Sequence, residues 1–287
     1  MKVLLKFIFS IAGVILVSGL PVLIRGLVAG EFRLAEYFRT IGEVLTSLWP
    51  LNEIAVFNYR LQREVVMYPQ VFEYIFYSLQ ILFLALAVAV IGAIAFTVLT
   101  MLLSEKARER VKLILYFLES IPDLLIIMLA QIGVIFIFEK TGMLVSKIAV
   151  IGDDRIYWLP ILCLAILPTI QLYRLCMLTF QEEERQMYVD LARSLGFSKA
   201  YIILMHMFRN AIISVFFQSK KTMWFMLSNL FVLELMFNLP GIMLFLRDNM
   251  TPQIFLLAVF SFFLPMFVLY SIGEWFFIRR LRGKEAV

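Results

Sequence analysis

Long apolar runs constrain this chain more than any other feature of its sequence. Of its 287 residues, 62% are hydrophobic and only 16% are charged, whereas soluble domains are about half apolar and about a quarter charged. A helix needs about 20 mostly apolar residues to cross the roughly 30 Å of hydrocarbon in a bilayer. Runs of that length recur along the chain, so we expect an integral membrane protein of the all-α class.

Six runs are expected to span the membrane. They cover residues 3–24, 72–103, 113–138, 158–180, 222–246 and 254–278. The first run follows Lys2 and Lys6, as the apolar part of a signal peptide would. It is long and no clean small-residue cleavage site follows it, so we interpret it as a span that is not cleaved.

The basic residues predict the orientation of these spans. Lysine and arginine are concentrated near the N-terminus, in the 104–112 and 181–221 segments and in the C-terminal tail. With six spans these regions share one side, which the positive-inside rule makes the cytoplasm. The net charge of +5 thus reflects topology, and we expect no nucleic-acid partner. Arginines in the 25–70 segment, on the other side, are interleaved with glutamates, and the rule weakens for long loops.

An amphipathic helix is expected within the 25–70 segment. Leu34, Phe38, Ile41, Leu45 and Leu48 recur at helical spacing, and Trp49 follows them. This pattern predicts a helix that lies at the outer interface or packs on the spans. We favour a packing element over a contact with substrate.

Disulfide and metal chemistry are not expected. Cys163 and Cys176 lie in one apolar run, and on a helix they would be about 20 Å apart, too far for a disulfide. His206 is the only histidine of the chain, and no cluster of cysteine and histidine accompanies it. We therefore expect no metal site.

The 181–221 segment is the one long polar interruption expected on the cytoplasmic side. Three glutamates from Glu182 onward favour the positively polarised start of a helix. Gly196 stands where a left-handed helix cap is expected, and Ser198 can cap a second helix from Lys199 to about Ile213. The pattern predicts a rigid helix–turn–helix that projects from the membrane and suits docking into a groove of a partner.

The residues of this segment follow a recognisable order. Tyr188 to Ser198 reads Tyr-Val-Asp-Leu-Ala-Arg-Ser-Leu-Gly-Phe-Ser, and His206 and Arg209-Asn-Ala follow. This resembles the coupling segment of ABC importer permeases, above all the subfamily that imports dipeptides, oligopeptides and nickel, which reads approximately Tyr-Val-x-x-Ala-Arg-Ala-x-Gly-x-Ser and then His-x-x-Arg-Asn-Ala. Asp190 stands where the broader signature has glutamate, which leaves the substrate class open.

Other stretches resemble the same family and extend the resemblance over about residues 71–278. They are Leu167-Pro168 with Tyr173-Arg174, Ser120-Ile-Pro122, and the Glu-x-x-Phe-x-x-Pro-Gly pattern from Glu234 to Gly241. The resemblance implies six transmembrane helices in the type I ABC importer permease fold with a cytoplasmic coupling helix. The implied division is a first span and outer loop at 1–70, a permease core at 71–280 with the coupling segment 181–221, and a cytoplasmic tail at 281–287.

The resemblance also implies the partners. The chain has no Gly-x-x-x-x-Gly-Lys-Ser/Thr phosphate loop, so we expect no enzymatic activity and no cofactor on this chain. ATP and Mg would bind two separate ATPase subunits. A homologous second permease, an extracytoplasmic substrate-binding protein and membrane lipid complete the expected partners. The expected location is the cytoplasmic (inner) membrane, with both termini in the cytoplasm.

Two groups of residues are candidates for function. The expected ATPase-coupling interface comprises Tyr188, Asp190, Ala192, Arg193, Gly196, Phe197 and Ser198, with Ala192, Gly196 and Phe197 at the contact itself. The candidate translocation path or gate comprises Glu234, Asn238, Pro240 and Gly241. For Glu234 a gating role and a structural hydrogen bond both remain open.

Four ionisable residues, Glu119, Asp123, Arg174 and Glu234, lie inside or near the ends of apolar runs. An isolated charge at the bilayer centre costs about 2.5–3.5 kcal/mol on insertion scales. We therefore expect each of them to face protein or a water-filled path. Arg174 lies near the cytoplasmic end of its span, where its side chain can reach the interface.

The resemblance implies import of short peptides by alternating access, with a nickel or other metal chelate as the alternative cargo. From another class, an ATP-independent channel or secondary transporter predicts no ATPase partner and no role for the coupling segment. A membrane scaffold that transports nothing predicts that neutralising Glu234 changes only stability.

Overall fold

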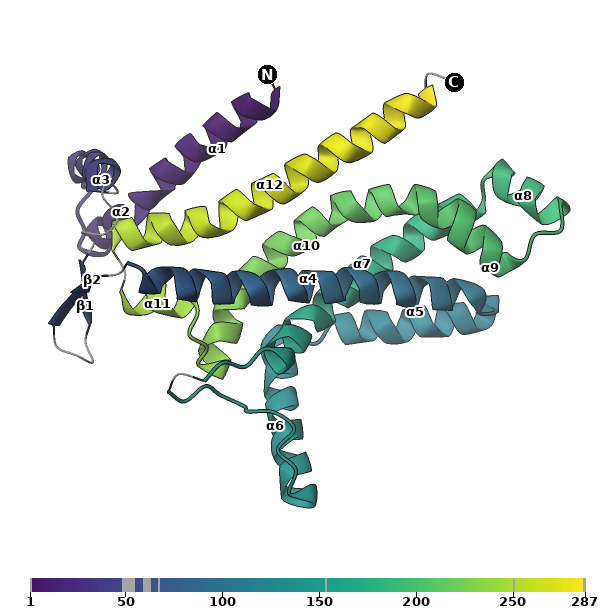
Figure 1. Cartoon of the computed structure of the whole chain (residues 1–287), viewed down its shortest axis with the longest axis horizontal. Coiled ribbons are helices and arrows are strands. Elements are labelled where there is room, and N and C mark those ends of the chain that lie inside the picture. Colours follow the sequence, from purple (N-terminus) through teal and green to yellow (C-terminus); the bar gives the residue numbers. More distant parts are fainter. Residues whose placement is uncertain are drawn as a thin grey trace. The chain divides into compact units, whose positions relative to one another are not determined.

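The computed structural model of the chain is almost entirely helical (Figure 1) and describes residues 2–47, 55–58, 63–66, 68–152, 154–249 and 251–285. The helices are α1 (Lys2–Ser18), α2 (Leu20–Val28), α3 (Leu34–Ser47), α4 (Gln70–Leu102), α5 (Glu105–Glu119), α6 (Asp123–Thr141), α7 (Trp158–Glu184), α8 (Met187–Ser194), α9 (Lys199–Tyr201), a π-helix (Ile202–Met207), α10 (Phe208–Phe237), α11 (Ile242–Asp248) and α12 (Pro252–Glu285). Strands β1 (Ala55–Asn58) and β2 (Arg63–Val66) form one antiparallel hairpin.

The chain divides into two compact units. The first comprises residues 1–79 and 240–287, and the second comprises residues 80–239. The chain passes between the units within α4 and at the bond between Leu239 and Pro240. The division into 1–70, 71–280 and 281–287 stays a prediction.

Helix α7 forms the centre of the second unit. Of the residues in its 18-residue apolar stretch, 61% are buried, and Leu172, Tyr173, Met177 and Phe180 are fully buried. Helices α5, α6 and α10 pack against it. A helix that is apolar around its whole circumference belongs in an interior, so α7 supports the elements that surround it.

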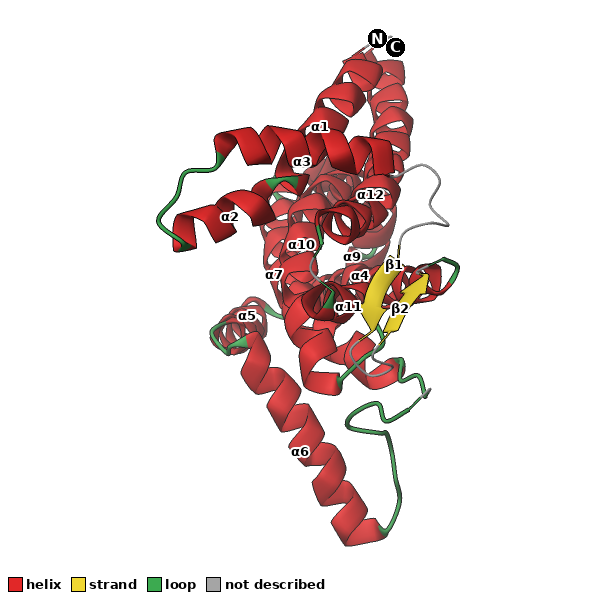
Figure 2. Cartoon of the chain, turned by 90° about the vertical axis from the view of Figure 1, so that its left-hand side faces the viewer, coloured by secondary structure: helices red, strands yellow, loops and turns green. Residues whose placement is uncertain are grey.

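In the first unit, α1 packs along α12. The ring of Phe7 lies 6.4 Å from that of Phe263 and 5.0 Å from that of Phe267, measured between centroids. The short α2 and the longer α3 follow α1 and run across its direction, as the two views of the chain show (Figure 2). The amphipathic helix expected within 25–70 is confirmed as α3, whereas Leu48 and Trp49 lie outside the described residues.

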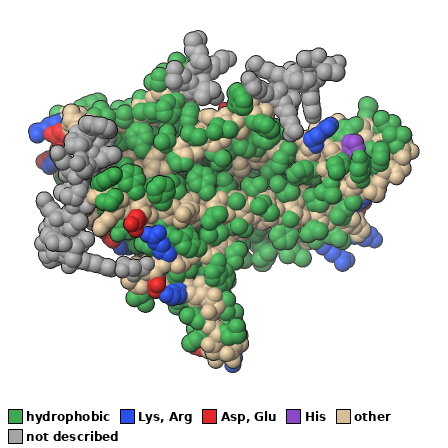
Figure 3. All heavy atoms as spheres, viewed as in Figure 1, with side chains coloured by type: hydrophobic (Ala, Val, Ile, Leu, Met, Phe, Trp, Pro, Cys, Tyr) green, Lys and Arg blue, Asp and Glu red, His purple; other side chains and the backbone are tan. Residues whose placement is uncertain are grey.

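Six helical stretches of the described chain are long and apolar enough to cross a membrane. They are Phe7–Val28, Gln70–Leu102, Asp123–Thr141, Trp158–Glu184, Lys199–Phe237 and Pro252–Phe277. Hydrophobic side chains cover most of the face seen in Figure 3, and charged side chains form small groups on it. The predicted fold class, an all-α membrane protein with six spans, is confirmed. The hairpin within 25–70 is a small addition to it.

The predicted third and fifth spans have wrong boundaries. The third, 113–138, is broken, because α5 ends at Glu119 and Pro122 has an extended backbone (φ −61°, ψ 141°) before α6. A proline disfavours helical conformation in the residue before it. The fifth, 222–246, ends earlier, because Asn238 is left-handed (φ 49°).

The prediction of a separate second cytoplasmic helix that ends near Ile213 is also wrong. From Lys199 the helix continues through the π-helical turn into α10 without interruption and ends at Phe237. No glycine or proline interrupts residues 199–237, so the backbone hydrogen bonds continue along them. One continuous helical element therefore joins the turn after α8 to residue 237.

Candidate coupling site and gate region

Local backbone geometry sets α8 apart from its neighbours. Gln186 caps it at the start with an extended backbone (φ −77°, ψ 144°). At its end Gly196 is left-handed, with φ +84°, and the N–H of Phe197 donates to the carbonyl oxygen of Ala192 at 3.2 Å, which makes a Schellman motif. A Cβ at position 196 would meet no atom within 4 Å. The backbone conformation, rather than crowding, therefore requires glycine, and the predicted left-handed cap is confirmed.

The chain turns directly from this glycine into the next helix. The Ser198 hydroxyl accepts a hydrogen bond from the N–H of Tyr201 at 3.4 Å and so caps α9, as expected. The rings of Phe197 and Tyr201 stack at 5.0 Å, and the His206 ring lies 5.7 Å from Tyr201 and 6.2 Å from Phe197. These three rings stiffen the turn and fix the direction of Phe197.

Glu183, near the end of α7, ties three helices together. Its carboxylate accepts hydrogen bonds from the Tyr188 hydroxyl and from the Asn210 side-chain amide, the latter at 3.2 Å. The same amide donates to the Tyr188 oxygen at 3.3 Å. Burial, and then the hydrogen bond to Glu183, raise the pKa of Tyr188 to about 12. Tyr188 therefore remains a neutral donor at neutral pH and links α8 to α7 and α10.

The neighbouring Glu184 makes a second set of links. It pairs with Arg108 of α5 at 2.8 Å and with Arg193 of α8 at 3.2 Å. The Arg108 side chain is 11% exposed and that of Glu184 is 22% exposed, and Arg108 also donates to the carbonyl oxygen of Met101 at 3.2 Å. Lys199 reaches the carbonyl oxygen of Leu103, just after α4, at 3.1 Å. The coupling segment is thus held by polar contacts to α7, α5 and the end of α4.

One face of α8 points inward and another is uncovered. Val189 and Ala192 are 0% and 5% exposed. On the uncovered side Met187, Leu191 and Leu195 recur every four residues and are 89%, 60% and 66% exposed. We call these three residues the α8 stripe.

The position of Ala192 corrects one expectation. Ala192 was predicted at a partner contact, but its side chain is buried by its own chain. Phe197, predicted at the same contact, is 45% exposed. The α8 stripe was missed, although the four-residue spacing of its apolar side chains was visible in the sequence.

The end of α10 is joined to the 142–157 loop. The Asn238 side-chain amide donates to the carbonyl oxygen of Val150 at 2.9 Å, and the N–H of Val150 donates to the carbonyl oxygen of Phe237 at 2.8 Å. Gln131 of α6, which sequence reasoning missed, donates to the carbonyl oxygens of Ile148 and Met236 at 2.9 and 3.1 Å. These bonds fix the loop against the C-terminal turn of α10.

The four candidate gate residues are divided between the two units. Glu234, which is fully buried, and Asn238 belong to the second unit. Pro240 and Gly241 belong to the first unit, where Gly241 precedes α11 and the N–H of Ile242 donates to the Ser78 hydroxyl at 2.9 Å. Glu234 and Asn238 thus lie in one unit, and Pro240 and Gly241 lie in the other.

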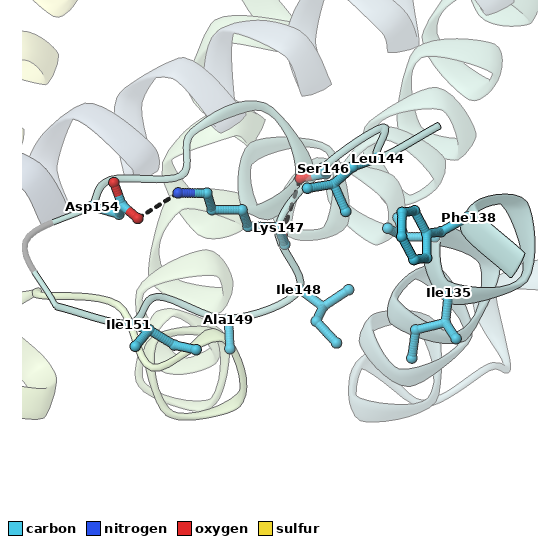
Figure 4. Close-up of a pocket in the computed structure, with 10 residues that line it drawn as sticks. Ile135, Phe138, Leu144, Ser146, Lys147, Ile148, Ala149, Ile151 and Asp154 are labelled. Carbon is cyan, nitrogen blue, oxygen red and sulfur yellow. Dashed lines mark hydrogen bonds and ion pairs between the residues drawn. The ribbon is translucent and has the colours of Figure 1, made fainter. Parts of the chain in front are cut away.

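An open cavity of about 400 Å³ lies between α6 and the same loop. Figure 4 shows Ile135 and Phe138 of α6 facing the loop residues that line it, and Lys147 paired with Asp154 at its side. Most of its lining is apolar. The loop that lines it is the one that Asn238, just after α10, holds through the carbonyl oxygen of Val150.

Two charged residues at the ends of or within the apolar helices, Arg174 and Asp123, have polar partners. Arg174 of α7 forms an ion pair with Glu119 of α5 at 3.0 Å, and Asp123 of α6 hydrogen-bonds the side chain of Asn229 on α10. Such pairs link the helices of the second unit and lower the cost of placing charges in apolar surroundings. Arg174, which was expected to reach the interface, thus has a partner in the chain.

Comparison with known proteins adds the family. Residues 89–282, more than half of the chain, match the model of the binding-protein-dependent transport system inner membrane component. No curated protein matches the chain. The matched residues include α7, α8 with its left-handed glycine, and α10. With six membrane-spanning helices, the chain belongs to this family of multi-pass membrane proteins, the permease components of ABC importers.

Proposed function

We propose that this permease couples the motion of a separate ATPase dimer to alternating access and so imports short peptides. The observation that carries the proposal is the α8 stripe, an uncovered apolar row on a short helix that polar contacts fix to three longer helices. Apolar anchors surrounded by polar groups are typical of the centre of an interface. The partner we propose for this row is a groove of the ATPase.

The contacts of α8 give this docking surface a way to move the spans. Glu183 and Glu184 connect α8 to α7, α5 and α10, and the turn at Gly196 leads into the continuous helix that ends at Phe237. A displacement of α8 would therefore be transmitted to several spans together. This is the physical link that coupling requires, an element whose position both sites can influence.

The residues of the coupling segment have different parts in this proposal. The α8 stripe and Phe197 provide the apolar contact, and Asp190 and Arg193 provide charges at its rim. Gly196 and Ser198 shape the turn, and Tyr188 holds α8 to α7. Ala192, which is buried, serves as internal packing.

The proposed assembly contains two ATPase subunits that bind ATP and Mg, a homologous second permease and an extracytoplasmic substrate-binding protein. It would lie in the cytoplasmic membrane with both termini of this chain in the cytoplasm. The concentration of basic residues near the termini and in the 104–112 and 181–221 segments supports this orientation.

The proposed cargo is a short peptide, because the stretch from Tyr188 to Ser198 and the His-x-x-Arg-Asn-Ala pattern that follows it resemble the peptide branch of the family. A metal chelate is the second candidate, since nickel importers share that branch. We place the gate at the end of α10, at Glu234, Asn238, Pro240 and Gly241. The buried Glu234 supports this placement, because acidic groups within spans commonly mark transport paths.

The gate has its own test. Uptake of radiolabelled di- and tripeptides and of nickel is measured with the wild-type chain and the Glu234→Gln variant in the full transporter. A changed rate or a changed preference is expected. If both stay at wild-type values, Glu234 is not a transport residue.

The docking role of α8 is tested by purification in mild detergent. In the Leu191→Glu variant, a carboxylate replaces an apolar side chain that the ATPase would bury. We therefore expect the ATPase no longer to co-purify, while the chain still inserts into the membrane. Arg110→Ala, at an exposed position of α5, is the matched control and should retain the ATPase. If Leu191→Glu retains both the ATPase and uptake, the stripe is not the docking surface. If the wild-type chain transports without an ATPase, the chain works as a channel or secondary transporter.

A further inference from the structure

Helix α3 has an orientation that a membrane span does not have. Figure 1 shows α3 end-on while α1 and α12 run in the plane of the view, and Figure 2, turned by 90°, shows α3 from the side. Within this unit, α3 therefore crosses the direction of α1 and α12. A helix that crosses the direction of the spans lies along the membrane plane.

The bend that produces this orientation is a packed feature. It falls at Gly19, between α1 and α2, where a Cβ would lie only 2.6 Å from the ring of Tyr37. The Tyr37 hydroxyl donates to the carbonyl oxygen of Leu16 at 2.7 Å, which satisfies a backbone acceptor in the last turn of α1. At the other end of α2, the N–H of Glu31 donates to the carbonyl oxygen of Gly26 at 2.8 Å.

Three faces follow one another around α3. Tyr37 and Val44 are buried on the inner face, and Ile41 beside them is half-buried. Next to this face lie Leu34, Phe38 and Leu45, which are 46%, 63% and 47% exposed. We call these three residues the α3 stripe.

The third face of α3 is charged and lies away from the stripe. Arg39 pairs with Glu43 at 2.7 Å on α3, and Arg33 pairs with Glu31 and Glu36 at 2.7 and 3.3 Å beside it. At about 100° per residue, the stripe lies between the buried face and the face that carries Glu36, Arg39 and Glu43. This order of faces is that of a helix half immersed in an interface.

Exposed apolar residues of the preceding helices extend the stripe. Ile24 and Leu27 of α2 are 58% and 59% exposed, and Leu16 at the end of α1 is 50% exposed. Helices α1 and α2 contribute to Phe7–Val28, a stretch that is long and apolar enough to cross a membrane, so their exposed apolar residues are suited to contact with lipid. The α3 stripe thus follows, along the chain, helices whose exposed apolar residues suit a lipid environment.

We propose that α3 is an amphipathic anchor in the headgroup region of the membrane, with phospholipid as its partner. The stripe faces the acyl chains, about 5–10 Å below the surface, and the paired charges face water. Because these charges are already paired within the chain, the binding is apolar and needs no anionic lipid. With the N-terminus in the cytoplasm, the anchor lies in the outer leaflet and holds the end of the first span at a fixed depth.

Spin labels at neighbouring positions of α3 test this proposal. Single cysteines are introduced as Phe38→Cys and Leu45→Cys on the stripe, and as Arg39→Cys and Glu43→Cys on the charged face. The native Cys163 and Cys176 are buried, and the unsubstituted chain measures their background labelling. The assembled transporter is placed in phosphatidylcholine nanodiscs, and collisions of each label with oxygen, which partitions into lipid, and with a water-soluble nickel chelate are measured.

The stripe labels should collide more with oxygen than with the chelate, and the Arg39→Cys and Glu43→Cys labels should show the reverse. Because all four positions lie on one helix, a disordered α3 would abolish the difference and so contradict the proposal. Equal access of the chelate to stripe and charged-face labels would overturn it. Stripe labels that are shielded from both reagents only when the binding protein or second permease is present would assign the stripe to a protein interface instead.

Discussion

Replacement of Gly196 by valine separates the cost of a backbone conformation from the cost of crowding. Gly196 has φ +84°, and a Cβ there would meet no atom within 4 Å. An L-residue in the left-handed region costs about 1–2 kcal/mol, and a β-branched residue is disfavoured there more strongly. A cost of about 2 kcal/mol lowers the equilibrium constant for forming the native turn about 30-fold. Phe197 and the α8 stripe would then lose their fixed direction relative to α9.

The assay uses the complete transporter in proteoliposomes and compares ATP hydrolysis with substrate uptake. We expect Gly196→Val to insert normally and to lower the uptake per ATP hydrolysed by an order of magnitude or more. Gly196→Asn should keep most of it, because asparagine adopts the left-handed conformation at low cost.

Gly30 provides the matched control for stability. It is also left-handed, with φ +75°, and a Cβ there would also meet no atom within 4 Å, but it lies between α2 and α3. Gly30→Val should carry a similar backbone cost and leave uptake per ATP unchanged. Wild-type uptake in Gly196→Val would refute the reasoning. An equal loss in both variants would show that general stability, rather than coupling, is affected.

Three further predictions concern the polar contacts. Glu184→Gln leaves Arg108, whose side chain is 11% exposed, without its counter-charge, so we expect the free energy of unfolding to fall by about 3 kcal/mol. Reversible unfolding in detergent measures this change. The Arg108→Met/Glu184→Gln double variant should lose less stability than the sum of the two single variants. Burial and the bond to Glu183 raise the pKa of Tyr188 to about 12, so the neutral phenol is favoured in the folded chain. The stability that Tyr188 contributes is present below its unfolded pKa of about 10 and is lost as the pH rises toward 12. A titration of tyrosinate absorbance in the wild-type chain should show a component near pH 12 that is absent in Tyr188→Phe. If the titration ends near pH 10 in both proteins, the prediction is contradicted. Asn238→Gly keeps the left-handed conformation and removes one hydrogen bond, so the free energy of unfolding should fall by about 1 kcal/mol. Asn238→Ala should lower it by about 1–2 kcal/mol more, because alanine is disfavoured in that conformation. Equal losses in the two variants would show that the backbone conformation carries no cost.

Some features of this fold could be predicted from the sequence because they depend only on residues that are close together in the chain. Six apolar runs predicted six spans, and a glycine after a short helix predicted the left-handed cap at Gly196. The cap at Ser198 followed from the same kind of pattern. The breaks at Pro122 and Asn238 were missed because hydropathy continues across them, although a proline and an asparagine each offered a signal.

The contacts between distant residues could not be read from the sequence. Arg108 and Glu184 are 76 residues apart, and Gln131 and Met236 are 105 apart, so neither pair follows from spacing. The burial of Ala192 depends on which face of α8 packs against its own chain. Helical spacing puts the residues of the α8 stripe and Ala192 on different faces, but only the fold shows which face is covered.

The unbroken helix from Lys199 to Phe237 has a mechanical consequence. Its 39 residues span about 58 Å along their path at 1.5 Å per residue, roughly twice the hydrocarbon thickness. Figure 1 shows that this element curves along its course, so it does not act as one straight rod. Because the helix continues through the π-helical turn Ile202–Met207 without a break, movement of the turn after α8 and movement at Asn238 are linked along one element.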